Sequence, residues 1–583
     1  MRTTLQVTKF SGIDERKTFG SDLSFAADMK NYRVTEDHTL KKRDGQRLVY
    51  SADSEIQGMW SGYLGSERHL LYIAGGRLFR YRPGQGATEL GSVGQSPCSL
   101  FEFRQRVYVK SAETYCFYDG NSLQPVEGYV PLVVIGSTPA GAGETFEDVN
   151  LLSPYRRVEF ACDSTSTTYH LPETGVYAII GFRLNGKETA VSTASRDLAA
   201  GTFTLKSPFK AGDTLEVMYQ MPSDRRDVVL KARGVMLFGG DTDGHVFLWG
   251  NPDAPNVRYH SELADGQPSA EYFPENNYTI IGDSEITDIV SQYDRQLIFT
   301  KDRAFYSYCE LQTDVLGNVF ASFPVYNLNG EKGSLLKNAG CIVNNEPITL
   351  CADGLNRWSS TTVENEKNAL CFSGPVQNTL RELLSRGEYD GMYLFNLRPT
   401  GELFLFYEGT GALVYQYRIG VWYAYKGLRV KYPVEYGGNL YYASFNQIRR
   451  LDPSAGEDVG EPIEAYWESP YISTGSESGS RVKLTRMDWT LRAEGQLELH
   501  INFGGEHLPD GSILPRRILQ KDCGGGKVCS GSFRPGGSGS GGMPLASRVK
   551  LRIDQSDTST NCEISELRLI STKKGAYTRD GIH

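Results

Sequence analysis

The sequence predicts an all-β protein, and three observations support this fold class. Aromatic residues make up 11% of the 583 residues, with 34 Tyr and 26 Phe. Gly and Pro contribute 63 and 25 residues, whereas charged residues are only 22%. Apolar runs such as Val130–Ile135 have the length of a strand. Many strands joined by tight turns have this composition, which disfavours disorder, coiled coils and helical bundles.

One pattern recurs along the chain: an apolar strand, a Gly or Asp-Gly turn, and an aromatic strand. About seven such units follow one another at a spacing of roughly 40 to 50 residues, which suits one four-stranded blade. Stacking such sheets radially buries both of their faces, so the pattern favours a β-propeller of about six to eight blades over a series of β-sandwiches. The units lie at residues 70–81, 107–120, 235–250, 296–308, 348–358, 392–425 and 436–451.

The spacing of the units divides the chain into five predicted parts. Residues 1–50 form an arm that packs on the propeller, because their apolar load is too high for a solvated tail. Residues 51–128 and 223–460 supply the blades. Residues 129–222 form an independent inserted β-domain, with a hairpin at Asn185-Gly186. Residues 461–583 form a C-terminal β-module with a Gly-rich loop at 503–547, and the one expected helix lies around Gln377–Arg386.

Enzyme motifs find little support, and we predict no catalytic, metal or cofactor site. Gly181–Lys187 matches G-x-x-x-x-G-K, but Glu188 follows where a P-loop needs Ser or Thr. His500 and His507 flank a turn, and exposed strand histidines explain them better than a metal does. Most cysteines are scattered in strands and fit small buried side chains in a reducing compartment. Cys523 and Cys529 fit either a hairpin disulfide or two free thiols.

The charge balance and the N-terminus bear on partners and location. The formal net charge of −9 argues against a protein that grips nucleic-acid phosphates. No run reaches the roughly 18 apolar residues of a membrane span. The first ten residues lack the apolar segment of a secretory signal, so we expect folding in a cytoplasm.

Two basic clusters look exposed in the sequence, Lys41-Lys42-Arg43 and Arg225-Arg226. A solvated turn or a domain junction explains them most simply. The alternative is a contact with an acidic surface on a neighbouring subunit.

The N-terminal segment carries a recognisable layout. Asp28-x-x-Asn31-Tyr32 is followed by Leu40-x-x-Arg43-x-Gly45. This layout resembles the opening of tail nozzle proteins, also called tail hub or DNA-stabilisation proteins, of short-tailed bacteriophages. Asn150–Arg156 resembles their inserted β-domain, and Tyr466–Tyr471 resembles the start of their C-terminal module. One departure is His38, which stands where the family often has Gly in the turn.

The resemblance implies a structural virion protein rather than an enzyme. Such proteins form a ring, usually a hexamer, below the portal and the adaptor protein; they retain packaged DNA and conduct it during genome ejection. It also implies assembly in the bacterial cytoplasm, a place in the virion tail, and contacts with tail fibres or other tail proteins. Double-stranded DNA would pass through the lumen without sequence-specific binding. The assembly candidates are Asp28, Asn31, Lys41, Lys42 and Arg43.

The Gly-rich loop at residues 503–547 has two interpretations, an exposed connector or a loop that narrows a channel when six copies meet. Its candidate residues are Lys521, Gly524, Gly525, Gly526 and Lys527. Gly suits a gate because it adopts positive φ freely. A glycan- or receptor-binding propeller adhesin is the alternative function, and a propeller hydrolase is the third. The recurring aromatics favour neither, because packing in strand cores explains them better.

Overall fold

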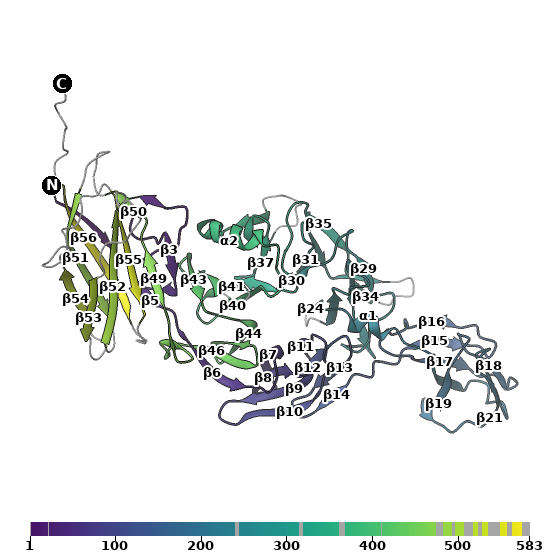
Figure 1. Cartoon of the computed structure of the whole chain (residues 1–583). Helices are drawn as coiled ribbons and strands as arrows, with labels where there is room; N and C mark the ends of the chain where they lie inside the picture. The colour runs from purple at the N-terminus through teal and green to yellow at the C-terminus, as the bar shows by residue number, and fades with distance from the viewer. Residues whose placement is uncertain are drawn as a thin grey trace. The chain divides into compact units, whose positions relative to one another are not determined.

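The computed structural model describes residues 2–20, 22–239, 244–313, 319–360, 368–407, 409, 411–473, 482–492, 496–505, 517–522, 528–533, 548–556 and 562–573. The chain is nearly all β and forms many small sheets (Figure 1). It divides into two compact units. The central unit comprises Gly62–Asn338 and Thr361–Glu366, and the terminal unit comprises Met1–Ser61, Ala339–Ser360 and Lys367–His583. Within the ranges given above, no helix combines the length and the hydropathy that crossing a membrane requires.

Four-stranded antiparallel sheets with strands in chain order build most of the central unit. In the second strand of the first sheet, His69 to Ala74 are all buried, so both faces of that sheet are covered. Gly75 and Gly76 then make the tight turn, with φ of 56° and 72°. The sheets are β7 (Ile56–Leu64), β8 (Glu67–Ala74), β9 (Arg77–Arg82) and β10 (Gly86–Ser92); β11 (Ser99–Phe103), β12 (Arg106–Lys110), β13 (Tyr115–Tyr118) and β14 (Leu123–Pro125); β24 (Gly234–Phe238), β25 (His245–Trp249), β26 (Val257–His260) and β29 (Tyr278–Ile280); and β30 (Asp288–Gln292), β31 (Arg295–Phe299), β32 (Ala304–Tyr308) and β35 (Val325–Asn329).

Three short elements accompany the last two of these sheets. Two hairpins connect the third and fourth strands, and a one-turn helix precedes β24. The sequence did not predict this helix, which has only five residues and no side-chain cap. These elements are the hairpin β27 (Leu263–Ala264) with β28 (Gln267–Pro268), the hairpin β33 (Glu310–Thr313) with β34 (Val319–Ser322), and α1 (Arg226–Leu230).

The terminal unit continues the same series of sheets. The last sheet takes its fourth strand from before the first sheet of the chain, because β46 pairs with β6, from Gln447 opposite Ser51 to Asp452 opposite Gly45. The expected helix is present as α2 (Gln377–Ser385) after the turn η2 (Gly374–Val376). The strands are β36 (Cys341–Val343), β37 (Glu346–Cys351), β38 (Gly354–Trp358) and β39 (Ala369–Cys371); β40 (Tyr393–Leu397), β41 (Glu402–Tyr407), β42 (Gly411–Gln416) and β43 (Val421–Lys426); and β44 (Lys431–Tyr436), β45 (Asn439–Ser444), β46 (Gln447–Asp452) and β6 (Gly45–Ser51), extended by β47 (Glu457–Asp458) and β48 (Glu461–Pro462).

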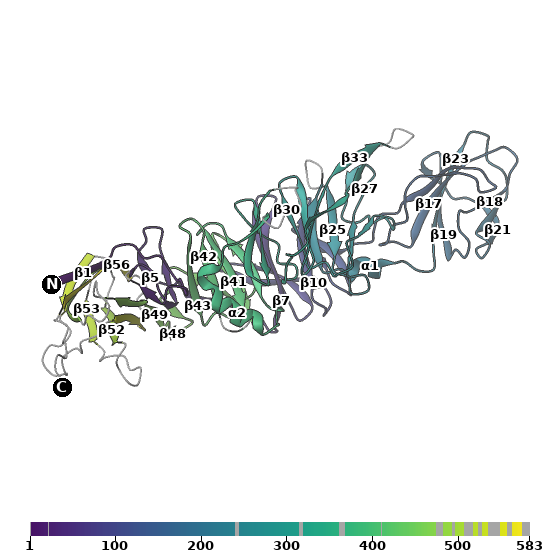
Figure 2. The same cartoon turned by 90° about the horizontal axis from the view of Figure 1, so that it is seen from above.

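Residues 129–222 contribute two further sheets that enclose their own core (Figure 2). Phe160, Phe203 and Val217 lie at its centre. The expected hairpin is present, with Asn185 and Gly186 at φ of 50° and 77° between β19 and β20. One sheet has the order β16 (Glu144–Thr145), β15 (Leu132–Ser137), β17 (Tyr155–Ala161), β23 (Thr214–Gln220), β19 (Ala178–Leu184) and β20 (Lys187–Glu188), and the other has β18 (Thr168–His170), β22 (Thr202–Leu205) and β21 (Thr193–Asp197).

The expectation that residues 129–222 form an independent domain stays a prediction, but one segment of the insert packs on the four-stranded sheets. Leu151 and Leu152 leave the insert and belong to a core cluster that contains Phe101 and Val246. Asn150 donates to the carbonyl oxygens of Tyr129 and Glu271, at 2.8 and 2.9 Å. The chain therefore enters the insert twice and returns to the four-stranded sheets in between, which no local sequence pattern reveals.

Replacing Leu152 by Ala is expected to lower the free energy of unfolding of the central unit by about 3 kcal/mol, because it leaves a cavity in that shared core. Thermal melting followed by circular dichroism measures the change. Tyr177→Ala is the matched control: Tyr177 lies within the insert and is 64% exposed, so a change below about 0.5 kcal/mol is expected. Equal effects of the two substitutions would favour the independent-domain interpretation.

Strands from both ends of the chain interleave in the C-terminal sheets of the terminal unit. Figure 1 draws the purple N-terminal strands beside the yellow-green C-terminal ones. One sheet has the order β4 (Tyr32–Val34), β5 (Leu40–Lys42), β56 (Glu563–Lys573), β51 (Val482–Arg492) and β54 (Val528–Phe533), with β1 (Arg2–Val7) also on β56. The other has β2 (Phe19–Gly20), β50 (Tyr471–Ser473), β55 (Arg548–Gln555), β49 (Ala465–Glu468) and β3 (Asp28–Lys30), with β52 (Gln496–Gly505) on β55 and β53 (Arg517–Asp522) on β52.

The N-terminal segment is buried between these sheets and the β40–β43 sheet. Phe10, Met29 and Tyr32 are almost fully buried, and the Phe10 ring meets Trp467 edge-on at 5.7 Å. β3 and β4 also contact β43. At the turn between β4 and β5, His38 takes the left-handed conformation with φ of 60°, which Gly adopts more readily than other residues.

Candidate functional site

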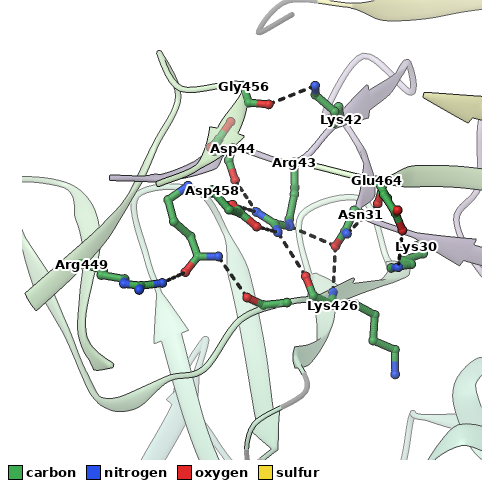
Figure 3. Close-up of polar contacts among 12 residues, drawn as sticks. Lys30, Asn31, Lys42, Arg43, Asp44, Lys426, Arg449, Gly456, Asp458 and Glu464 are labelled. Atoms are coloured by element: carbon green, nitrogen blue, oxygen red, sulfur yellow. Dashed lines mark hydrogen bonds and ion pairs between the residues drawn. The ribbon is translucent and has the colours of Figure 1, made fainter. Parts of the chain in front are cut away.

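Arg43 is the centre of a buried polar junction in the terminal unit (Figure 3). Its side chain is 2% exposed, and both Nη atoms donate to the Asp458 carboxylate, at 2.9 and 2.5 Å. Nη2 also donates to the Lys426 carbonyl at 3.1 Å, and Nε donates to the Asn31 side chain at 3.0 Å. A planar guanidinium suits such a task, because its donors diverge in one plane and hold several acceptors at once.

Asn31 completes the junction from the other side (Figure 3). It adopts a left-handed φ of 56°, a conformation that Asn tolerates better than most residues. Its side-chain oxygen accepts the Lys426 amide at 2.8 Å in addition to Arg43, and its side-chain nitrogen donates to the Glu464 carbonyl at 2.8 Å. One side chain thereby links the β43 edge, the N-terminal segment and the start of the C-terminal sheets.

Gly45 and Gln46 extend the junction along β6. A Cβ atom on Gly45 would lie 2.2 Å from the Glu457 carbonyl oxygen, so only Gly fits. Gln46 donates to the Gly427 carbonyl at 3.1 Å and accepts the Tyr442 hydroxyl at 2.7 Å. The recognised layout therefore has a physical explanation: its Asn, Arg and Gly fasten the N-terminal segment to the β40–β43 and β44–β46 sheets.

The interpretation of Lys41-Lys42-Arg43 as an exposed cluster is wrong. Lys42 and Arg43 are each 2% exposed, and Lys42 donates to the Gly456 carbonyl at 3.1 Å. Lys41 pairs loosely with Glu563, at 3.9 Å. The side chains of Lys42 and Arg43 bond within their own chain. Their hydrogen-bond donors bind backbone carbonyls and the Asp458 carboxylate, all more than 380 positions away. They are not available for a subunit contact.

The remaining sequence candidates lie apart from Arg43 or outside the described residues. The Asp28 carboxylate accepts the Tyr466 hydroxyl at 2.8 Å, in an exposed place where β3 pairs with β49. Lys521 lies in β53. Gly524, Gly525, Gly526 and Lys527 fall outside the described residues, as do Cys523 and His507. Three predictions therefore stay untested: the channel loop, the state of Cys523 and Cys529, and the interpretation of His500 and His507 as exposed histidines.

A second buried cluster, which sequence reasoning missed, lies around Glu402 in the same unit. Its carboxylate accepts the hydroxyl of Tyr423, and it accepts that of Thr400 at 2.7 Å. Burial raises the pKa of the Glu402 carboxyl above its usual range, although the nearby Arg33 guanidinium and these hydroxyls act in the opposite direction. Arg33 itself pairs with Asp44 at 3.2 Å.

The described residues contain no candidate metal site. No group of three or more His, Cys, Asp or Glu side chains there has the arrangement to hold an ion. The polar clusters around Arg43 and Glu402 stabilise the packing of neighbouring strands, because their donors and acceptors bond to one another.

Lys110 is a buried cation in the central unit, at the end of β12. Its ammonium is 2% exposed and donates to the carbonyls of Ala232 and Leu230, at the end of α1. Burial lowers the pKa of Lys110 to about 7. The unfolded chain keeps this proton up to about pH 10.4, so between these values the unfolded state binds more protons and stability rises with pH.

We therefore expect the wild type to gain stability relative to Lys110→Met by up to about 1.4 kcal/mol per pH unit between pH 7 and pH 9. Urea unfolding at pH 7, 8 and 9 measures the difference. The range ends at pH 9 because the neighbouring Cys98 thiol, whose pKa burial raises to about 11, stays protonated there in the folded state. A difference that is flat over this range would contradict the assignment.

Comparisons with known proteins add little. No family model and no curated protein matches the chain. A crystal structure of BBS1N in complex with ARL6DN is similar over 73% of this chain and 97% of that chain, at 10% identity and a TM-score of 0.25. The extracellular domain of a one-component system from B. thetaiotaomicron covers 89% of this chain and 90% of that chain, at 10% identity and a TM-score of 0.19. Scores of this size carry no argument about fold or function.

Proposed function

We propose that this chain is a structural protein of the tail of a short-tailed bacteriophage. In this proposal, copies of the chain form a ring, with six as the expected number, below the portal and adaptor. The ring retains packaged DNA and conducts it during ejection. The protein has no catalytic task, and its place is the virion tail after assembly in the bacterial cytoplasm.

We further propose that the repeated sheets are the blades of one β-propeller. Within the central unit β11 contacts β24 and β24 contacts β30, and within the terminal unit β36 contacts β40 and β40 contacts β44. The first strands of successive sheets therefore meet, as they do around a propeller axis. The completion of the last sheet by β6 also supports this arrangement, since a strand from before the first blade then joins the last one.

The observation that carries the functional proposal is the Arg43 junction. Three residues of the recognised layout, Asn31, Arg43 and Gly45, lie in it and fasten the C-terminal sheets to the β40–β43 sheet. A ring that holds DNA under pressure needs subunits that do not yield, and buried multidentate contacts provide this rigidity. The net charge of −9 suits a lumen that does not retain phosphates.

Two measurements test the proposal. The purified full chain is examined by mass photometry and cryo-electron microscopy, and purified phage particles from the source are analysed by protein mass spectrometry. We expect rings with a central channel, and the chain as a component of the particles. A chain that is absent from particles and monomeric at every concentration would contradict the proposal, and saturable binding to host glycans by such a monomer would favour the adhesin alternative.

A further inference from the structure

Three tyrosines form a surface cluster on the sheet of β30, β31, β32 and β35 in the central unit. Tyr306 and Tyr308 lie on β32, and Tyr326 lies on β35 directly opposite Tyr306. Alternate residues of a strand face the same side of a sheet, so all three side chains share one face. Tyr326 is 39% exposed, and the other two are half-buried. Small reagents in solution can therefore reach the cluster.

Within this cluster, the rings of Tyr308 and Tyr326 are the most nearly parallel pair. Their planes meet at 10°, and their centroids are 5.7 Å apart. Tyr306 lies nearer to Tyr326, at 5.2 Å, but its plane is tilted by 25°. The hydroxyl groups of Tyr308 and Tyr326 are hydrogen-bonded to each other. The ring carbons ortho to these two hydroxyl groups are therefore also close together.

Glu310 is in position to take a proton from Tyr308. Hydrogen bonds to the Tyr326 hydroxyl and to the Glu310 carboxylate raise the pKa of the Tyr308 hydroxyl, and burial acts in the same direction. A phenol that loses an electron must also release its proton, and a hydrogen-bonded carboxylate can accept it. Thiols reduce oxidised phenols, but the Cys309 side chain packs against a core cluster on the other face of the strand.

We propose that Tyr308 and Tyr326 are a site of oxidative cross-linking, at which a one-electron oxidant joins β32 to β35 through a dityrosine bond. Tyr308 gives one electron to the oxidant and its phenolic proton to Glu310. Tyr326 gives one electron to the oxidant and its phenolic proton to water. The two phenoxyl radicals then form a carbon–carbon bond between their ortho positions. Each ortho hydrogen moves as a proton to the phenolic oxygen, which restores both rings, so the chain loses two protons and two electrons in total.

The parallel arrangement of the rings suits this reaction. Radical coupling uses orbitals that stand perpendicular to the ring planes, and partly overlapping parallel rings direct these orbitals at each other. A pair that the fold holds together also reacts in preference to pairs that meet by diffusion. The new bond closes a loop that contains the β33–β34 hairpin, and such a closure stabilises a fold by restricting the unfolded chain. This proposal does not depend on ring formation.

The test illuminates the full chain with ruthenium tris-bipyridyl and persulfate, which supply a one-electron oxidant. We expect dityrosine fluorescence whose yield per chain does not depend on protein concentration. Digestion after Glu residues cuts at Glu310, between the two tyrosines. Mass spectrometry is then expected to find the two fragments joined and lighter by two hydrogen atoms than their sum.

Single substitutions identify the reacting pair. Tyr308→Phe and Tyr326→Phe are each expected to lower the yield of joined fragments at least about tenfold, because the remaining pairs are less well placed. Tyr306→Phe is the matched control from the same cluster, and a change below about twofold is expected. Glu310→Gln is expected to slow the rise of dityrosine fluorescence at least about threefold, because the proton acceptor is lost.

Four results would each overturn the proposal. They are the absence of joined fragments, a loss in Tyr306→Phe as large as that in Tyr308→Phe, cross-links that form mainly between chains at low protein concentration, and an unchanged rate in Glu310→Gln. The substitutions to Phe keep the rings and their packing, so circular dichroism of each variant is expected to match that of the wild type.

Discussion

Replacing Arg43 by Met is expected to lower the free energy of unfolding of the terminal unit by about 3–5 kcal/mol, because it leaves the Asp458 carboxylate and the Asn31 oxygen without their buried donor. Methionine keeps much of the side-chain volume, so the loss reports the missing hydrogen bonds rather than a cavity. Urea unfolding followed by tryptophan fluorescence measures it, since Trp422 and Trp467 are buried in this unit.

Arg47→Met is the matched control for this substitution. Arg47 pairs with Asp452 at 2.9 Å, but its side chain is 55% exposed. Exposed ion pairs contribute little, so a loss of at most about 1 kcal/mol is expected. Similar losses in the two variants would show that the Arg43 junction is not a special source of stability.

Replacing Gly45 by Ala is expected to destabilise the same unit by about 3 kcal/mol, the upper end of the usual cost of overpacking. The new Cβ atom would meet the carbonyl oxygens of Glu457 and Ala455 at 2.2 and 2.7 Å. Both contacts are with backbone, so no side-chain rotation relieves them. The shift in urea midpoint measures the effect.

Gly330→Ala controls for the general effect of adding a methyl group. Nothing lies within 4 Å of the position of its Cβ atom, and its φ is not in the left-handed region. We expect a change of no more than about 0.5 kcal/mol. A Gly45→Ala chain as stable as Gly330→Ala would mean that β6 and the loop before β47 do not pack as described.

Local sequence signals predicted the β fold, the Asn185-Gly186 hairpin and helix α2, because turn chemistry and apolar periodicity act over a few residues. They did not predict where the N-terminal strands pair. β3, β4 and β5 have three residues each. Strands this short carry no pattern that selects a partner. β4 pairs with the neighbouring β5, but the partners of β3 and β5 in the C-terminal sheets, β49 and β56, lie more than 400 positions away.

The sequence pointed to the right residues at the junction but did not reveal that they are buried. Asn31 and Arg43 were identified through the recognised layout, yet their charge and polarity suggested a surface. Charged side chains are rarely fully buried unless they are paired, and the partner of Arg43 is Asp458, which no local pattern connects to it. Glu402 and Lys110 gave no signal, because each lies at the end of a strand next to a turn, where charged residues are common.

The pairing of β1, β2, β3, β5 and β6 with strands near the C-terminus has a consequence for synthesis. The first fifty residues leave the ribosome early, but β46, β49 and β56 follow 400 or more residues later. At about 5–20 residues per second, this wait lasts roughly 20 seconds to two minutes. During translation, Phe10, Met29 and Tyr32 have no strands to pack against. The nascent chain therefore needs protection at its leading end until its last strand is made.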